Sequence, residues 1–331
     1  MKPTTHWMVA MVLAGVALAQ PAVAATNVLR MAVLWPKGSK WMTDMQTSGR
    51  EIARKSDGRV QLKFVEQDDL DVGDSRCDGA MLAGPRLARY SQDCLVYALP
   101  LLFRSDAEAD YVRKVVDPVI TAALRTQHLS VLGVESAGFA YLHSMQPVDT
   151  VEKLQAAKLW VPPEEPELLA LAKQYGITLV PLELNKVREG LEQGVVDTVI
   201  TPPVGAIVMQ WHADLKCVMD APFMYVYVVI VWRQEAFDKL SLADRALLQE
   251  VLGPVFAAAF RETRLKEAEA LDVLAQNGVA RHKLAATPEQ QAAWSAWASA
   301  VADRLVNAGS LSSNVLTTVR ARLAEFRRQK P

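Results

Sequence analysis

The sequence has few cysteines, and none of them belongs to a recognisable motif. Cys77, Cys94 and Cys217 are the only three in 331 residues, and no Cys-x-x-Cys pair occurs. An odd number cannot pair completely within one chain; an oxidising compartment would permit a Cys77–Cys94 bridge, which the sequence leaves open. The five histidines are scattered along the chain. We therefore expect no metal site and no cofactor.

The chain also lacks an excess of charge of either sign. It carries 36 Lys and Arg residues against 37 Asp and Glu residues, a formal net charge of −1. No basic stripe is visible. Nucleic acid is therefore not an expected partner, because proteins that bind it concentrate Lys and Arg on one face.

Long hydrophobic runs are missing as well. The first apolar run, 7–19, is too short for a membrane-spanning helix, which needs about 20 residues. It follows Lys2 and precedes Gln20-Pro21 and the small-x-small sequence 22–24. This pattern is typical of a cleaved signal peptide, residues 1–24, with an uncleaved anchor as the alternative.

After the signal peptide, no segment reaches about 18 consecutive apolar residues. The most apolar one, 223–232, is rich in Tyr and Val and predicts a buried strand. Removing Lys2 changes the charge from 36 − 37 = −1 to 35 − 37 = −2. We expect an exported, soluble protein that does not itself span a membrane.

Motifs of enzyme active sites are absent too. The chain has no GxSxG, HExxH or GxGxxG sequence. A Ser, His and Asp brought together only by folding would escape this search, but we expect no enzyme. An acidic loop contains Asp68, Asp69, Asp71 and Asp74, yet position twelve counted from Asp69 is Ala80, where a calcium loop needs Glu. We interpret it as a solvated loop.

Short apolar runs do alternate with helical patterns over most of the chain. A strand is expected at 28–34, followed by a helix with Ser39 as N-cap and Trp41, Met45 and Ile52 on one face. Further strands are expected at 60–64, 78–82, 129–134, 139–144, 157–161, 177–181, 195–200, 215–220 and 223–232. Strands separated by helices indicate βαβ units and mainly parallel sheets.

The last eighty residues have a different pattern. Segments 254–276, 288–308 and 311–328 are helical, rich in Ala, Glu and Arg, and give no strand signal. About 307 mature residues exceed what one hydrophobic core serves, so we expect two lobes. The predicted fold is α/β and bilobal, with a helical tail that braces the lobes and a ligand cleft between them.

Several motifs in a fixed order now point to a family. They are PKGSKW (36–41), DGRVQLKF (57–64), LPLLF (99–103), GVESAGFAYLHSMQPV (133–148), VEKLQAAKLWVP (151–162) and LEQGVVDTVITPP (191–203). In this order, over roughly residues 28 to 250, the chain resembles the solute receptors of tripartite ATP-independent periplasmic (TRAP) transporters, the family named for dicarboxylate uptake.

The resemblance implies a periplasmic receptor that closes on a small solute and delivers it to TRAP membrane subunits. It also implies the lobe boundaries. These are residues 28–138 with 232–253 for one lobe, 144–222 for the other, 139–143 and 223–231 for hinge strands, and 254–331 for a spanning helix and tail. A sensory or scaffolding module on the same fold, without transport, is the alternative.

Trp160 marks a departure from that family. The segment matching Lys158-Leu159-Trp160-Val161 usually has an arginine at its third position, which pairs with the solute's carboxylate. The upstream "GFR" pattern appears as Gly138-Phe139-Ala140, so a second cation is missing. We expect Trp160 and Phe139 to line the cleft; the alternative for Trp160 is a core tryptophan behind the strand end.

Other candidate ligand contacts are less specific. Trp35 follows the first strand, where α/β folds bind ligands, whereas Trp41, Gln210 and Trp211 fit packing equally well. Lys186 or Arg188 could replace the missing clamp, although an isolated cation at a helix start is more often a solvated surface group. Thr201 stands where relatives often have Asn, and segment 66–80 is shorter than usual. These departures favour an aromatic or largely apolar solute, acid or not, without identifying it.

Overall fold

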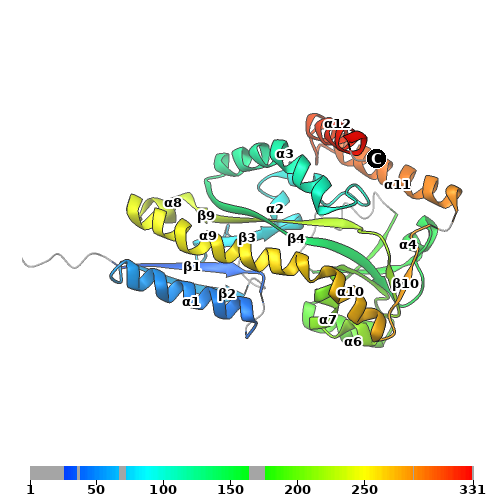
Figure 1. The fold of residues 1–331 in the computed structure, drawn as a ribbon, viewed down its shortest axis with the longest axis horizontal. Coiled ribbons are helices and arrows are strands. Elements are labelled where there is room, and N and C mark those ends of the chain that lie inside the picture. Colours follow the sequence, from blue (N-terminus) through cyan, green and yellow to red (C-terminus); the bar gives the residue numbers. More distant parts are fainter. Residues whose placement is uncertain (1–25, 36–37, 67–71, 164–175, 286, 330–331) are drawn as a thin grey trace, which may run out of the picture.

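The computed structural model describes residues 26–35, 38–66, 72–163, 176–285 and 287–329. They form an α/β protein with two lobes connected by long strands (Figure 1). The expected signal peptide and Asp68, Asp69 and Asp71 of the acidic loop lie outside the described residues.

The first lobe is built on a five-stranded sheet. Its order is β2 (Val60–Glu66), β1 (Asn27–Val33), β3 (Gly79–Ala83), β9 (Met224–Arg233) and β4 (Leu129–Ser144). β1 is parallel to β2 and β3, whereas β9 is antiparallel to both of its neighbours. The two long strands β4 and β9 therefore interrupt the parallel arrangement that the sequence pattern predicts.

The second lobe has a smaller sheet. From β4 outward it continues through β7 (Thr198–Thr201), β5 (Lys158–Val161) and β6 (Thr178–Pro181). On the other side of β4 lie β8 (Cys217–Met219) and then β10 (Ala280–His282). β10 corrects the expectation that the last eighty residues contain no strand; three residues between helices give too little periodicity to be recognised.

β4 belongs to both sheets. It pairs with β9 from Leu129 to Ala140 and with β7 from Tyr141 to Ser144. The two strands expected at 129–134 and 139–144 are thus one continuous strand, with a break in register between Ser136 and Phe139. This strand carries the chain directly from one lobe into the other.

Helices cover both faces of the first sheet. They are α1 (Lys40–Lys55), α2 (Gly84–Ala88), α3 (Asp106–Thr126), α8 (Gln234–Asp238) and α9 (Leu242–Leu265). The second lobe holds α4 (Val151–Ala156), α6 (Val187–Glu192) and α7 (Pro203–Val208); α10 (Glu267–Gln276), α11 (Pro288–Asn307) and α12 (Ser313–Gln329) follow. Short 3-10 turns occur at Gln92–Val96, Leu184–Lys186 and Trp211–Ala213.

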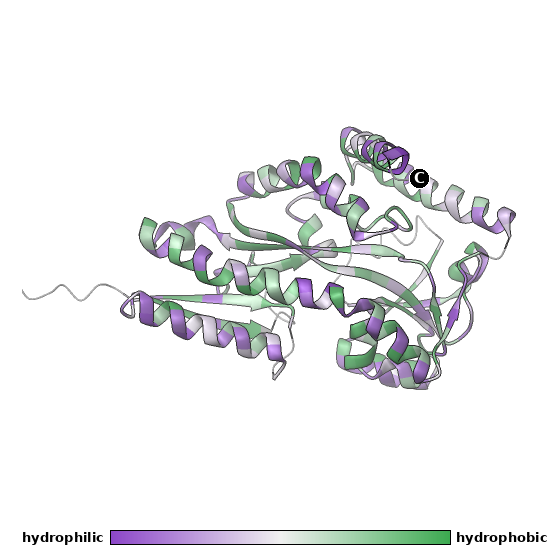
Figure 2. Cartoon of the chain, in the orientation of Figure 1, coloured by the Kyte–Doolittle hydropathy of each residue, from purple (hydrophilic) through white to green (hydrophobic). Residues whose placement is uncertain are grey.

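Alternation along the strands explains this layering. In β9, Val228, Ile230 and Trp232 face α1 and α9, whereas Val229 and Val231 face α3. Successive side chains of a strand point to opposite faces, so a strand covered on both sides must be apolar throughout. Figure 2 shows these central strands as mostly hydrophobic, with hydrophilic residues spread over the helices.

The spanning helix differs from its expected limits. It begins at Leu242 rather than Pro254, because Ser241 caps it by accepting a hydrogen bond from the Asp244 N–H (3.1 Å). Pro254 lies inside the helix. The helix is interrupted at Lys266, after which α10 continues to Gln276 and contacts α7. Together α9 and α10 extend from the first lobe to the second (Figure 1).

None of the three cysteines, all within the described residues, forms a disulfide, and all three are buried. A Cys77–Cys94 bridge, which the sequence left open, is not formed. Burial raises the pKa of the Cys94 thiol far above its usual range, so this side chain behaves as a small apolar group of the first lobe's core.

Candidate functional site

Candidate residues of the first lobe lie where β1 ends. The carboxyl end of β1 points toward the part of the molecule that holds α6 and α7 (Figure 1). In α/β sheets, ligands bind beyond such strand ends. Trp35 follows this end directly, and Trp41 lies in the first turn of α1.

The Trp35 ring is a core side chain. It is 7% exposed and lies 5.9 Å from the Phe256 ring, 5.4 Å from Phe260 and 6.1 Å from Trp41, measured between centroids. These neighbours belong to α1 and α9, so Trp35 connects the start of α1 to the spanning helix. Trp41 is half-buried, and its indole N–H has no hydrogen-bond partner among the described residues.

In the second lobe, Trp160 and Trp211 meet edge to face. Their ring centroids are 5.3 Å apart with an interplanar angle of 66°. Trp160 is half-buried at the end of β5, and its Nε1–H donates to the Leu182 carbonyl oxygen at 2.8 Å. Trp211 is 3% exposed and belongs to the lobe's apolar core. The exposed part of the Trp160 ring can therefore contact a ligand, whereas the indole N–H, its only side-chain donor, is already bonded to Leu182.

The two cations considered as replacements for the missing clamp both have partners. Arg188 donates from Nη1 to the Gln210 side-chain oxygen (2.9 Å) and approaches Glu192 to 3.3 Å. Lys186 pairs with Glu189 at 2.9 Å. Both cations are exposed. Gln210 has a positive φ of 58°, uncommon for a residue other than glycine, and this turn places its side chain against α6.

Thr201 contacts β4 through its backbone. The His143 Nε2 atom lies 3.2 Å from the Thr201 carbonyl oxygen, where β4 pairs with β7. Burial lowers the pKa of His143 to about 4, and the contact with Thr201 only partly opposes this. His143 is therefore neutral at physiological pH.

Phe139 lies in β4 at the junction of the two sheets. It is 3% exposed, and its ring meets Tyr225 of β9 edge-on with centroids 5.3 Å apart. Its backbone N–H donates to Glu267 Oε2 at 2.9 Å, and the Tyr141 hydroxyl donates to Glu267 Oε1 at 2.7 Å. Glu267 opens α10 and so links the spanning helix to this part of β4.

The approach of Glu267 depends on Gly138. This residue has φ +80°, and a Cβ built on it would lie 2.6 Å from Glu267 Oε2. Burial raises the pKa of Glu267, and the donors from Tyr141 and Phe139 oppose that effect without reversing it. Sequence reasoning missed Glu267; the available signal was Gly138, since a glycine inside a strand pattern suggests a bulge.

A second half-buried polar group adjoins the long strands. Arg113 of α3 pairs with Asp117 at 3.0 Å and donates to the Val134 carbonyl oxygen at 2.8 Å. The Tyr97 hydroxyl donates to the other Asp117 oxygen at 2.8 Å. These contacts tie α3 to β4, and no sequence motif marks them.

The structure thus gathers the candidates in separate groups. Trp35 and Trp41 share the first lobe, Phe139 lies at the sheet junction, and the second-lobe candidates are Trp160, Lys186, Arg188, Thr201, Gln210 and Trp211.

Within the described residues, no three His, Cys, Asp or Glu side chains gather as a metal site would require. None of the described helices is both long and apolar enough to cross a bilayer.

Comparison with known proteins agrees with this architecture. Residues 31–308 match the family model described as "Bacterial extracellular solute-binding protein, family 7". A solute-binding protein of Verminephrobacter eiseniae is 23% identical over 236 residues, which are 67% of this chain and 69% of that protein.

Solved structures show the same fold at low sequence identity. A Bordetella pertussis extracytoplasmic solute receptor binding pyroglutamic acid has a TM-score of 0.76 at 15% identity and covers 90% of this chain and 100% of its own. A Fusobacterium nucleatum TRAP protein with sn-glycerol-3-phosphate scores 0.77 at 17%, covering 92% and 99%. A Sulfurospirillum deleyianum TRAP protein with succinate scores 0.75 at 17%, covering 90% and 99%.

Proposed function

The chain belongs to family 7 of the bacterial extracellular solute-binding proteins, and we propose that it binds a small organic solute between its lobes in the periplasm and delivers it to a TRAP-type membrane transporter. The strand connections support a closing movement, because β4 runs from one sheet into the other. A two-lobed receptor connected in this way can open and close around a solute.

Trp160 carries the argument about solute class. It stands where the resemblance places a carboxylate-binding arginine, at the end of β5, and its indole N–H is bonded to Leu182. An arginine would offer five donors in a planar fork, whereas this indole offers only a ring. The solute we propose therefore presents an aromatic or largely apolar group to this wall.

The neighbouring cations support the same conclusion. Arg188 is engaged by Gln210 and Glu192, and Lys186 by Glu189. Recruiting either one as a clamp would require breaking these contacts. The structurally similar proteins named above hold pyroglutamic acid, glycerol phosphate and succinate. We expect this receptor to differ from the succinate-bound protein by binding small dicarboxylates poorly.

A thermal-shift screen tests this proposal. The mature protein is incubated with succinate, malate, fumarate, aromatic acids, keto acids and lipids. A true ligand at a hundredfold excess over Kd should stabilise the fold by about 2.7 kcal/mol. We expect an aromatic or apolar compound to do so and succinate to bind no better than millimolar. Micromolar succinate binding in calorimetry would contradict the proposed solute class.

Trp160→Arg is the sharper variant, with Trp160→Lys as its control. Arginine restores the residue that the resemblance leads us to expect, so measurable succinate binding should appear. Lysine adds the same charge without the planar fork and should restore less. Folded Trp160→Arg protein that gains no carboxylate affinity would place the solute site elsewhere.

A further inference from the structure

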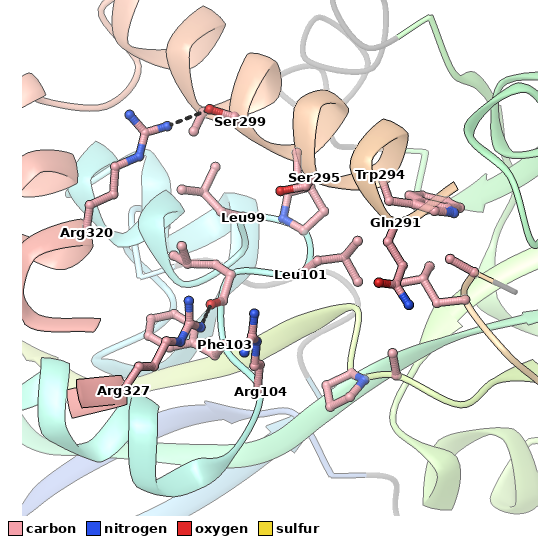
Figure 3. A pocket seen from close by; sticks show the side chains of 18 of the residues that line it. Leu99, Leu101, Phe103, Arg104, Gln291, Trp294, Ser295, Ser299, Arg320 and Arg327 are labelled. Carbon is pink, nitrogen blue, oxygen red and sulfur yellow. Dashed lines mark hydrogen bonds between the residues drawn. The ribbon is translucent and has the colours of Figure 1, made fainter. Parts of the chain in front are cut away.

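A pocket of about 670 Å³ lies apart from the candidate residues of the two lobes. It is formed by the loop 99–104, the connection 220–222, the segment 283–285 and helices α11 and α12 (Figure 3). In Figure 1, α11 and α12 lie on the opposite side of the long strands from α6 and α7. Its volume is typical of sites for small organic ligands, about 300–1,000 Å³.

One wall of the pocket is apolar. Leu101, Leu284 and Ala298 pack against the core but stay partly exposed, and Trp294 closes the wall from α11. The Trp294 indole N–H is bonded to the Asp149 carbonyl oxygen at 3.0 Å, which fixes its ring. A partly exposed apolar wall inside a pocket gains free energy when a ligand covers it.

The charged groups of the pocket differ in their partners. Arg327 binds both oxygens of Glu108 at 2.8 Å, and Arg320 binds Asp303 at 3.1 Å. Arg104 and Lys283, by contrast, are exposed and form no ion pair with any residue that the structure describes. Two exposed cations outside any ion pair, next to an apolar wall, are complementary to an organic anion.

Backbone strain at the same place is an independent observation. Leu101 has φ +57°, a left-handed conformation that is unusual for a bulky residue. Its N–H donates to the Phe223 carbonyl oxygen at 2.7 Å, which holds the strained turn. Residues held in such conformations cluster at ligand sites. This turn places Leu101 in the lining of the pocket. Arg104 follows three residues later, and Figure 3 shows its side chain pointing toward the pocket.

We propose that this pocket is a second ligand site, which binds an organic anion with an apolar body. The acidic group binds Arg104 and Lys283, and the apolar body covers Leu101, Leu284 and Ala298. This site is separate from the interlobe site proposed above and does not depend on it.

Fluorescence titration with anilinonaphthalene sulfonate, an aromatic anion, tests the proposal on the mature protein. We expect saturable binding at one site. Arg104→Gln combined with Lys283→Gln should raise the Kd for the dye about tenfold or more, because hydrogen bonds between charged groups are stronger than those between neutral groups. Ser295→Trp, at an exposed lining position, should weaken binding similarly by filling the pocket.

Matched controls separate this site from other binding. Arg50→Gln combined with Lys239→Gln removes two cations elsewhere, and Ala296→Trp adds an indole to α11 outside the pocket lining; neither should change the Kd by more than about twofold, as expected for surface changes. Trp160→Ala should also leave the dye affinity unchanged. Unchanged binding in the double charge variant or in Ser295→Trp, or loss only in Trp160→Ala, would overturn the proposal without bearing on the proposed transport function.

Discussion

At the scale of single residues, Trp160 combines two roles that its position in the sequence does not separate. Its ring packs against Trp211 in the second lobe, and its N–H is bonded to the Leu182 carbonyl oxygen. It is nevertheless only half-buried. The residue therefore contributes to the stability of its lobe whether or not a solute covers the exposed part of the ring.

Two substitutions separate the contribution of the Trp160 ring to stability from that of its N–H hydrogen bond. Trp160→Ala removes the ring and should lower the free energy of unfolding by about 2–3 kcal/mol, below the 3–5 of a fully buried tryptophan. Trp160→Phe keeps an aromatic ring but loses the donor, which should cost about 1 kcal/mol. Urea unfolding measures both. Equal losses would mean that the hydrogen bond, rather than the ring, sets the cost.

Gly138 allows a second test at this scale, with Gly278 as a matched control. Both have positive φ, +80° and +85°, but an added Cβ meets Glu267 Oε2 at 2.6 Å only at Gly138. Gly278→Ala should cost about 1–2 kcal/mol, the usual penalty for a left-handed residue with a Cβ.

Gly138→Ala should lower the free energy of unfolding by at least about 1 kcal/mol more than Gly278→Ala does, because either the bulge in β4 or the Glu267 side chain must move. Urea unfolding of the two variants gives the difference. Adding Glu267→Ala should reduce the excess at Gly138, because the clashing carboxylate is then absent. An excess that persists in the double variant would show that Glu267 is not its cause.

At the scale of elements, helix α12 is held to the body of the protein at its carboxyl end. Arg327 donates to both oxygens of Glu108 on α3 and to the Leu102 carbonyl oxygen. The Glu108 side chain is 6% exposed. Arg320, on the same helix, pairs with Asp303 where both side chains are exposed.

These two ion pairs should differ in strength. Arg327→Ala leaves a buried carboxylate without its partner and should destabilise the fold by about 2–3 kcal/mol, somewhat less than a fully buried pair because Arg327 is partly exposed. Arg320→Ala removes a surface pair and should cost about 0–1 kcal/mol. Thermal unfolding compares them; similar losses would mean that Glu108 finds another partner.

The same pair predicts a dependence on pH. Burial alone would raise the pKa of Glu108, but the hydrogen bonds from Arg327 and from the Arg104 backbone outweigh it and leave the pKa lowered. The stabilisation by the Arg327–Glu108 pair is therefore complete above the ordinary pKa of a glutamate, about 4.3. It is lost as the pH falls through the lower pKa that Glu108 has in the folded protein. Wild type should lose stability relative to Arg327→Ala over that range. A constant difference down to the acid-unfolding limit would contradict this.

At the scale of the whole molecule, β4 and β9 join the lobes, and α9 with α10 runs alongside them (Figure 1). Glu267 fastens the start of α10 to β4, so a change of angle between the lobes must be accommodated near this contact. Hinges are a few residues at the ends of elements that absorb the backbone change. We propose that residues 139–143 of β4 and residues 223–231, which include most of β9, form the hinge between the lobes.

Closure can be measured in solution. The compound that gives the largest thermal shift should lower the radius of gyration in small-angle scattering, because the lobes approach each other around it. A compound that gives no shift serves as the control at the same concentration. An unchanged radius at saturating ligand would indicate a rigid module, as a scaffolding role would require.

The amino-acid sequence by itself determined the family and most of the elements. Strand and helix periodicity come from residues close together in the chain, which is why the Ser39 cap, the strand at 223–232 and the two last helices were recognised. The fold class followed from their order. The start of the spanning helix was misplaced because Pro254 suggested a boundary that the surrounding apolar contacts override.

Only the tertiary structure decided which side chains share a site. Glu267 is 128 residues from Phe139, and Arg327 is 219 from Glu108, so no local pattern joins them. The partners of Arg188 and of the Trp160 indole likewise became visible only in the fold. A sequence records which groups are available, whereas hydrogen bonding and burial depend on distances that long-range packing alone sets.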